Sequence, residues 1–188
     1  MSASKSATNK VSKYAIAVLL VAIPAVEGLR HTVYKDQGGV PTVCSGVTGA
    51  NIKMGMTFTA KQCQDMNLQA ILSHTKPLEK IPHQLPDRVN IAFGSWLYQY
   101  GETNFNSSTA RKYLTQNRLK DACDEILRWR FTRVGENKVD CSLKSSRCGG
   151  VWKRAQNNNL LCLGKITTDQ YLQRIGAEPL RYEGQYTN

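Results

Sequence analysis

The chain has 188 residues, of which 41% are hydrophobic and 21% charged, and its formal net charge is +11. This composition excludes a largely disordered chain, because it supplies enough apolar material for one domain with a sizeable core. The basic excess favours a polyanionic partner, which is a nucleic acid, an acidic membrane surface or an acidic cell-wall polymer.

Six cysteines in so short a chain predict disulfide bonds, and disulfide bonds indicate an oxidising compartment. The alternative is a zinc site. The sequence does not have the ligand spacing of a zinc site. It has no C-x-x-C, and His31, His74 and His83 do not stand at ligand spacing beside the cysteines. We therefore expect neither a metal nor a cofactor.

The N-terminal segment has the composition of an export signal. Residues 1–13 are polar and carry Lys5, Lys10 and Lys13 without an acidic residue, and an uncharged apolar run follows from Tyr14 to Val26. The run is 13 residues long, whereas a helix needs about 20 residues to cross the hydrocarbon core. Three interpretations remain open at this point: a cleaved signal peptide, a permanent anchor, or a marginal anchor that leaves the bilayer.

Residues 27–49 contain two carboxylates and a hydroxyl, Glu27, Asp36 and Thr42. We expect a helical start here, with Glu27 at a helix end. From Gly38 onward, glycines and a proline interrupt a β-rich run, which predicts short strands joined by tight turns. Two carboxylates held apart by rigid structure suit glycoside hydrolysis, in which one acts as an acid and the other stays ionised. The alternative is two solvated carboxylates that flank a turn, because acidic residues at this spacing are common.

The full string resembles the active-site segment of the phage-type lysozymes, glycoside hydrolase family 24. The residues that match are Glu27-Gly28, Tyr34-Lys35-Asp36, Gly39-Val40-Pro41-Thr42 and Cys44-Ser45-Gly46-Val47-Thr48-Gly49. The form with Cys44 is most similar to the lambdoid-phage endolysins that carry a signal-anchor-release segment. The resemblance implies an α+β, mostly helical, lysozyme-like fold with a small N-terminal β-hairpin lobe and a larger helical lobe.

The resemblance also implies an activity, hydrolysis of the β-1,4 bond between N-acetylmuramic acid and N-acetylglucosamine in peptidoglycan, for lysis of the host cell. Glu27 would be the general acid, Asp36 would orient or activate water, and Thr42 would position that water. This is an inverting mechanism, for which the carboxyl groups stand ~6.5–9.5 Å apart.

Two other functions are alternatives. A catalytically inactive, lysozyme-like envelope-binding protein is compatible with the basic charge alone. A lytic transglycosylase would use the glutamate without Asp36, so the presence of Asp36 argues against it. We expect a monomer. Binding to nucleic acid is not expected, because the chain has no basic run with interleaved aromatic residues.

The resemblance favours the releasable anchor over a cleaved signal. Cleavage after Ala25 would make Glu27 the second residue, and a free terminus rarely supplies the packed, partly dry surroundings that a catalytic acid needs. We therefore expect residues 1–26 to be exported uncleaved through the bacterial inner membrane, released to the periplasm and packed into the protein. While inserted, the segment would hold Glu27 at the membrane and prevent the site from assembling.

Residues 27–188 are expected to form a single catalytic domain, with the hairpin lobe at 27–58 and the helical lobe at 59–175. Thr59 and Gln62 match a capping box at the start of a helix, and Gly101 is a plausible helix end. The predicted helices are 59–76, 87–100, 107–116, 119–130 and 167–175, with a proline-marked loop at 77–86.

A third family landmark is matched by Tyr98-Gln99-Tyr100-Gly101, Phe105 and Ser108-Thr109, with Gln99 in place of the usual asparagine. The resemblance implies that the substrate contacts come from Tyr34, Gln99, Phe105 and Ser108. An equal alternative for Ser108 is that it only caps the next helix.

Residues 131–148 resemble an insertion relative to those endolysins. Chain proximity and the resemblance favour the pairs Cys44–Cys63, Cys123–Cys162 and Cys141–Cys148, although six cysteines allow other pairings. In the helix that follows, Gly150-Val151-Trp152-Lys153-Arg154 and Cys162 match part of a family motif, but Ala155 and Asn158 stand where the family has a second arginine and a glutamate. We therefore expect this helix to lack the ion pair that usually braces it.

Overall fold

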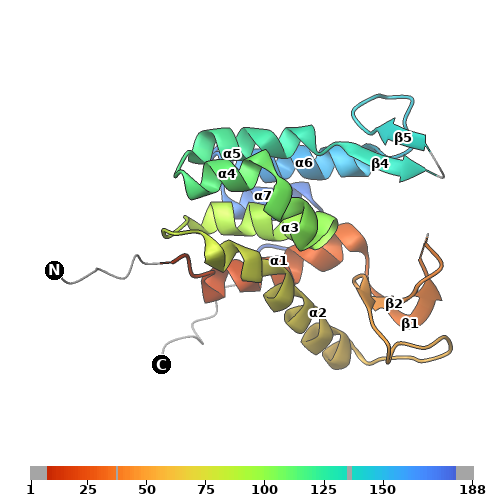
Figure 1. Cartoon of the computed structure of the whole chain (residues 1–188). Coiled ribbons are helices and arrows are strands. Elements are labelled where there is room, and N and C mark those ends of the chain that lie inside the picture. Colours follow the sequence, from red (N-terminus) through yellow and green to blue (C-terminus); the bar gives the residue numbers. More distant parts are fainter. Residues whose placement is uncertain (1–7, 37, 135–136, 181–188) are drawn as a thin grey trace, which may run out of the picture.

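The computed structural model describes residues 8–36, 38–134 and 137–180. A small sheet lobe lies beside a larger helical lobe, with α2 running between them (Figure 1). This confirms the predicted α+β, mostly helical class. The elements are α1 (Lys13–Glu27), β1 (Arg30–Lys35), β2 (Pro41–Cys44), β3 (Val47–Thr48), α2 (Ala60–Thr75), η1 (Lys76–Lys80), α3 (Asp87–Ser107), α4 (Thr109–Thr115), α5 (Leu119–Glu125), η2 (Ile126–Arg128), β4 (Phe131–Val134), β5 (Asn137–Asp140), α6 (Gly149–Cys162) and α7 (Thr168–Arg174).

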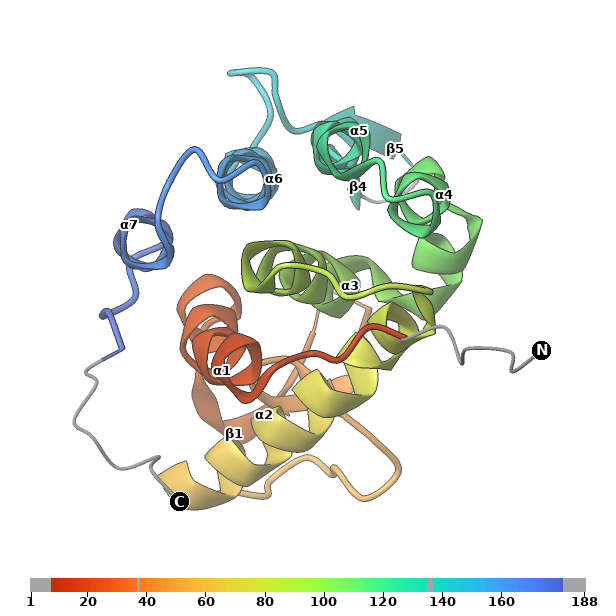
Figure 2. The ribbon, with the colours of Figure 1, turned by 90° about the vertical axis from the view of Figure 1, so that its left-hand side faces the viewer.

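Helix α3 is the centre of the helical lobe, and α1, α2, α4 and α6 surround it (Figure 2). Every residue from Val89 to Leu97 is buried, which confirms that this helix is enclosed on most sides. The expected stop at Gly101 is confirmed, because α3 consists of two helical segments that meet at a kink there. The backbone breaks there at φ +80°, which glycine tolerates, and a helical segment continues to Ser107. Phe105 in this segment is fully buried, so its packing draws the chain back onto the core.

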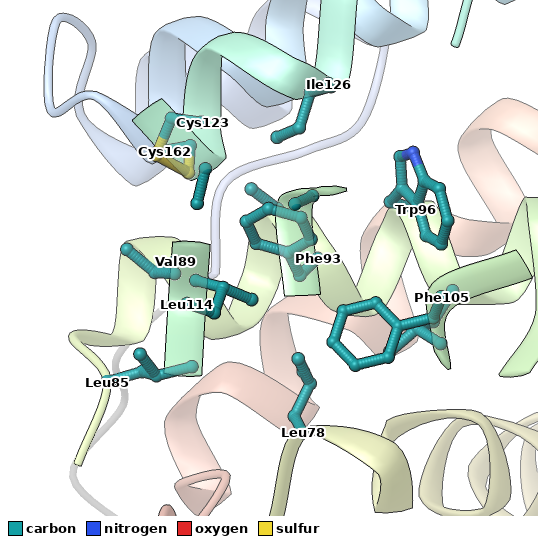
Figure 3. Packing of buried hydrophobic residues seen from close by; sticks show 14 of the residues in the cluster. Leu78, Leu85, Val89, Phe93, Trp96, Phe105, Leu114, Cys123, Ile126 and Cys162 are labelled. Atoms are coloured by element: carbon teal, nitrogen blue, oxygen red, sulfur yellow. A yellow bond between two sulfur atoms is a disulfide. The ribbon is translucent and has the colours of Figure 1, made fainter. Parts of the chain in front are cut away.

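Aromatic rings dominate the largest core cluster. The rings of Phe93 and Trp96 lie 6.2 and 6.0 Å from that of Phe105, in edge-on arrangements. Figure 3 shows these side chains with Leu78 of η1 below them, Leu114 of α4 to the left, and the Cys123–Cys162 disulfide at the edge of the cluster. That disulfide joins α5 to the end of α6.

The apolar N-terminal run forms α1, which packs into the protein. Its buried face recurs at helical spacing and consists of Ala15, Val18, Leu19, Ala22 and Ile23. Gly94 of α3 lies directly against this face, and a Cβ atom at Gly94 would stand 2.6 Å from Cδ1 of Leu19. In the described ranges, no helix has both the length and the apolar character to cross a membrane.

Asn9 fastens the chain just before α1 to the helical lobe. The residue is 1% exposed. Its amide nitrogen donates to the backbone carbonyl of Leu78 at 3.2 Å and to Oδ1 of Asn90 at 2.8 Å. Its carbonyl oxygen accepts from the backbone N–H of Leu85 at 2.9 Å and from the side-chain amide of Gln84 at 3.1 Å. The N-terminal segment is therefore anchored by a buried polar contact as well as by apolar packing.

The small lobe is an antiparallel sheet in the order β1–β2–β3. The expected short strands after Gly38 are present, but the helical start expected between Glu27 and Asp36 is wrong beyond Glu27. Residues 30–35 form a strand instead, because β1 pairs with β2 and Thr32 bridges to Thr57. These non-local hydrogen bonds decide the structure of a segment whose local preference is weak.

The other expected helices and the proline-marked loop are present with small changes. Thr59 and Gln62 form the predicted capping box of α2, and Thr167 and Gln170 form another at α7. The helices expected at 107–116 and 119–130 are shorter, as α4 and α5. The expected loop at 77–86 begins within the short helix η1. Residues 131–134 and 137–140 pair as antiparallel strands, which we call the β4–β5 hairpin.

The structure contains the disulfides Cys44–Cys63, Cys123–Cys162 and Cys141–Cys148. These are the three pairs that chain proximity and the resemblance favoured. The first joins the end of β2 to α2, so it holds the sheet lobe against the helix that connects the two lobes.

Replacing Asn9 by alanine is expected to lower the free energy of unfolding by about 2–4 kcal/mol, because several buried polar groups lose their partners together. Urea unfolding with an unchanged m-value measures this loss. Asn51 is exposed, and Asn51→Ala serves as the control, with a change near zero. Equal stability of the Asn9 and Asn51 variants would contradict the anchoring role.

Candidate active site

Glu27 is the last residue of α1, and an arginine from a distant part of the chain holds its side chain. The guanidinium of Arg154 in α6 contacts Oε1 of Glu27 and also donates to Oγ and the backbone oxygen of Ser95 in α3, each at 3.2 Å. The Arg154 side chain is 8% exposed and that of Glu27 is 31% exposed. Three helices therefore meet at one ion pair. The surroundings of Glu27 are wetter than the partly dry pocket that we expected.

Hydrogen bonds to Asn158 continue this contact into the core. Its amide nitrogen donates to Oγ of Ser95 at 3.2 Å, and its carbonyl oxygen accepts from the hydroxyl of Tyr171 at 3.0 Å. Burial raises the pKa of Tyr171, so its hydroxyl keeps the proton that it donates here. Ala155 and Asn158 cannot form the family's ion pair, but hydrogen bonds of Arg154 and Asn158 attach α6 to α3 and α7 instead.

Asp36 lies in the turn that follows β1, and the backbone of this turn fixes its carboxylate. Oδ1 accepts hydrogen bonds from the N–H groups of Gly38 at 2.8 Å and Val40 at 2.9 Å. Within the described ranges, no group hydrogen-bonds to Oδ2 of Asp36. One carboxylate oxygen therefore orients the group, and the other is available to a water molecule or a substrate.

Thr42 stands on β2 opposite Tyr34. It is 2% exposed, and its hydroxyl donates to the backbone oxygen of Val40 at 2.9 Å. The hydroxyl therefore braces the turn that holds Asp36, and only its lone pairs remain for another partner.

Glu27 lines a groove of about 1070 Å³ between the two lobes. The structure brings Gln99 of α3 and Gly38, whose N–H binds Asp36, to the same groove as Glu27 and Arg154. The other residues that line it are Ala25, Val26, Thr132, Arg133, Arg147, Cys148, Gly150, Val151, Lys153, Asn157 and Ile175.

Two of the predicted substrate contacts have other roles. Phe105 is fully buried in the core. Ser108 is 8% exposed, and its hydroxyl caps α4 by accepting from the N–H of Arg111 at 3.0 Å. Tyr34 is half-buried, with the guanidinium of Arg30 4.4 Å from its ring centre, and it does not line the groove. Of the four predicted contacts, the groove contains Gln99.

Arg154 is the site residue that sequence reasoning missed. It was noted as part of a partial family motif, but it was given no role. Its partner Glu27 lies 127 positions earlier, so no local pattern connects the two. Its signal in the sequence was a match to the family arginine at that position.

Tyr98 joins α3 to the sheet lobe. Its hydroxyl donates to the backbone oxygen of Ser45 at 2.8 Å, and the side chain of Asn67 in α2 donates to Oγ of Ser45 at 3.1 Å. Burial, followed by the nearby Glu27 charge, raises the pKa of Tyr98 to about 12. The hydroxyl is therefore protonated near neutral pH, and this contact holds the β2–β3 turn against α3.

Arg154→Gln is expected to lower the free energy of unfolding by about 1–3 kcal/mol, because it leaves buried oxygens of Ser95 and the carboxylate of Glu27 without a charged partner. In a Glu27→Gln background the same change should cost less, which a double-mutant cycle by urea unfolding measures. Lys144 is exposed, and Lys144→Gln provides the control, with a change near zero. Purely additive losses would show that Glu27 and Arg154 are not coupled.

The sequence resembles those of known proteins. The sequence model described as phage lysozyme matches residues 24–148. A SAR-endolysin of Enterobacteria phage P21 is 35% identical over 124 residues, which are 62% of this chain and 74% of the relative. A SAR-endolysin of Pseudomonas phage phiKMV is 31% identical over 128 residues, 66% and 78% of the two chains.

Solved structures show the same fold. An endolysin from Escherichia coli O157:H7 phage FAHEc1 superposes with a TM-score of 0.69 at 24% identity, over 84% of this chain and 95% of that one. The muramidase domain of SpmX from Asticaccaulis excentricus gives 0.67 at 17% identity, over 82% and 98%. The match to the family model and the identity to the phage relatives confirm the resemblance: the chain belongs to the phage lysozyme family.

Proposed function

We propose that the protein is an endolysin that hydrolyses the β-1,4 bonds between N-acetylmuramic acid and N-acetylglucosamine in peptidoglycan. One observation carries this proposal: Glu27 lines an open groove, held by Arg154, next to the turn that fixes Asp36. Membership of the phage lysozyme family and the names of the phage relatives support it.

In the proposed mechanism, Glu27 donates a proton to the glycosidic oxygen as the bond to the anomeric carbon breaks. Asp36 accepts a proton from a water molecule that attacks the opposite face of the sugar, so the reaction inverts the anomeric configuration. The backbone N–H groups on Oδ1 of Asp36 leave Oδ2 for that water. Thr42 braces the turn that holds Asp36, and a lone pair of its hydroxyl helps to position the water. The Gln99 amide contacts the glycan.

We also propose that residues 1–26 are an uncleaved signal-anchor that is released to the periplasm. The phage relatives are named SAR-endolysins, and α1 carries Glu27 at its end. A helix whose apolar face is in lipid cannot pack that face against α3 at the same time. Glu27 would then be kept from Arg154 until the segment leaves the membrane, which couples activity to release.

Glu27→Gln is expected to reduce peptidoglycan clearing by about 10²–10⁴-fold, which is the usual contribution of a general acid. The substituted side chain keeps the size and the hydrogen-bonding oxygen but has no proton to give to the leaving group. Turbidity loss of purified walls measures the rate. Products of the parent protein should carry reducing muramic acid ends.

Glu79→Gln is the matched control, because Glu79 is exposed and lies away from the groove. Equal clearing by the parent and Glu27→Gln proteins would show that Glu27 is not the acid. Absence of clearing by the parent protein would favour the inactive, envelope-binding alternative. Anhydromuramic products would instead indicate transglycosylase chemistry.

A further inference from the structure

One wall of the groove is basic. Glu27 and Arg154 neutralise each other, and the other charged residues that line the groove are Arg133, Arg147 and Lys153. All three are exposed, and none of them forms an ion pair with any residue in the described ranges. Three unpaired positive charges in a concave site produce a local field that attracts anionic groups.

The segment that resembles an insertion supplies two of these charges. Arg133 lies on β4, and the β4–β5 hairpin stands across from β1 and β2 (Figure 1). Arg147 lies next to Cys148, whose disulfide to Cys141 closes a short loop directly before α6. The nearby acid Asp140 is already paired with Arg130 at 3.0 Å, so it does not neutralise this wall. The hairpin and its disulfide therefore place cations at the groove.

The same wall also contains an unused hydrogen-bond donor. Asn157 is 2% exposed and lines the groove, and its amide nitrogen has no partner within the described ranges. Its carbonyl oxygen already accepts from Nε of Arg174 at 2.8 Å. Gly150, Lys153 and Asn157 follow one another at helical spacing on one face of α6. A buried donor left without a partner is costly, so this position favours an acceptor from a ligand.

We propose that Arg133, Arg147, Lys153 and Asn157 form a subsite for the carboxylates of the peptide stem of peptidoglycan. This rests on the proposed function, which brings peptidoglycan into the groove. The β-1,4-linked sugar backbone is uncharged once the muramic lactyl group carries a peptide, so the stems supply the carboxylates nearest to the cleaved bond. The β4–β5 hairpin is thus a specificity element that favours stem-bearing glycan over bare glycan.

Binding of soluble glycan fragments, with stems or after enzymatic removal of the stems, tests this subsite. Titration calorimetry on the full chain carrying Glu27→Gln avoids turnover. We expect stem-bearing fragments to bind at least about tenfold more tightly than stem-free fragments, as several charge-assisted hydrogen bonds would produce. The triple variant Arg133→Gln, Arg147→Gln, Lys153→Gln should lose most of this preference, whereas Arg147→Lys should retain it.

A matched triple variant removes the same charge elsewhere. Lys76, Lys112 and Lys165 are exposed and do not line the groove, so their change to glutamine should leave the preference intact. Equal affinity of the Glu27→Gln protein for both fragments would overturn the proposal, as would an equal loss of preference in both triple variants. Because binding is measured without hydrolysis, failure here is separate from failure of the proposed activity.

Discussion

The ion pair between Glu27 and Arg154 is the contact on which the site depends. It joins the end of α1 to α6, and the hydrogen bonds of Arg154 to Ser95 tie both helices to α3. The position of Glu27 is therefore fixed by the packing of the whole N-terminal helix. Asn9 anchors the start of that helix in the same lobe. The candidate acid is held at the meeting point of three helices, whereas Asp36 is held by the backbone of a single turn.

This arrangement gives the N-terminal segment two competing environments. The apolar run is short for a bilayer and includes Pro24, which would make its hold in a membrane marginal. In the folded protein, the apolar face of α1 packs against α3, where Gly94 leaves room for Leu19. The side-chain amide of Asn9, just before α1, donates a hydrogen bond to Asn90. One sequence is thus compatible with an export signal and with the core of a folded lobe. The proposed regulation follows from the fact that it cannot occupy both at once.

The features that local chemistry determines were predictable from the sequence. The capping box at Thr59 and the helix end at Glu27 depend on residues within a few positions of each other. The strand β1 was missed because its partners lie on β2 and at Thr57. The role of Arg154 was missed for the same reason, since its contact with Glu27 spans most of the chain. Phe105 and Ser108 were assigned by their place in a motif, but core packing and helix capping occupy their side chains.

The claim that docking of α1 assembles the site is tested most directly by opening the contact between α1 and α3. Gly94→Val places side-chain atoms where Leu19 now packs, and hydrogen exchange of backbone amides then reports each helix separately. The account predicts that the backbone amides of α1 lose protection while those of α6 stay protected. The rate of peptidoglycan clearing should fall in proportion to the protection lost in α1. A variant whose α1 amides exchange freely while clearing continues at the parent rate would contradict it.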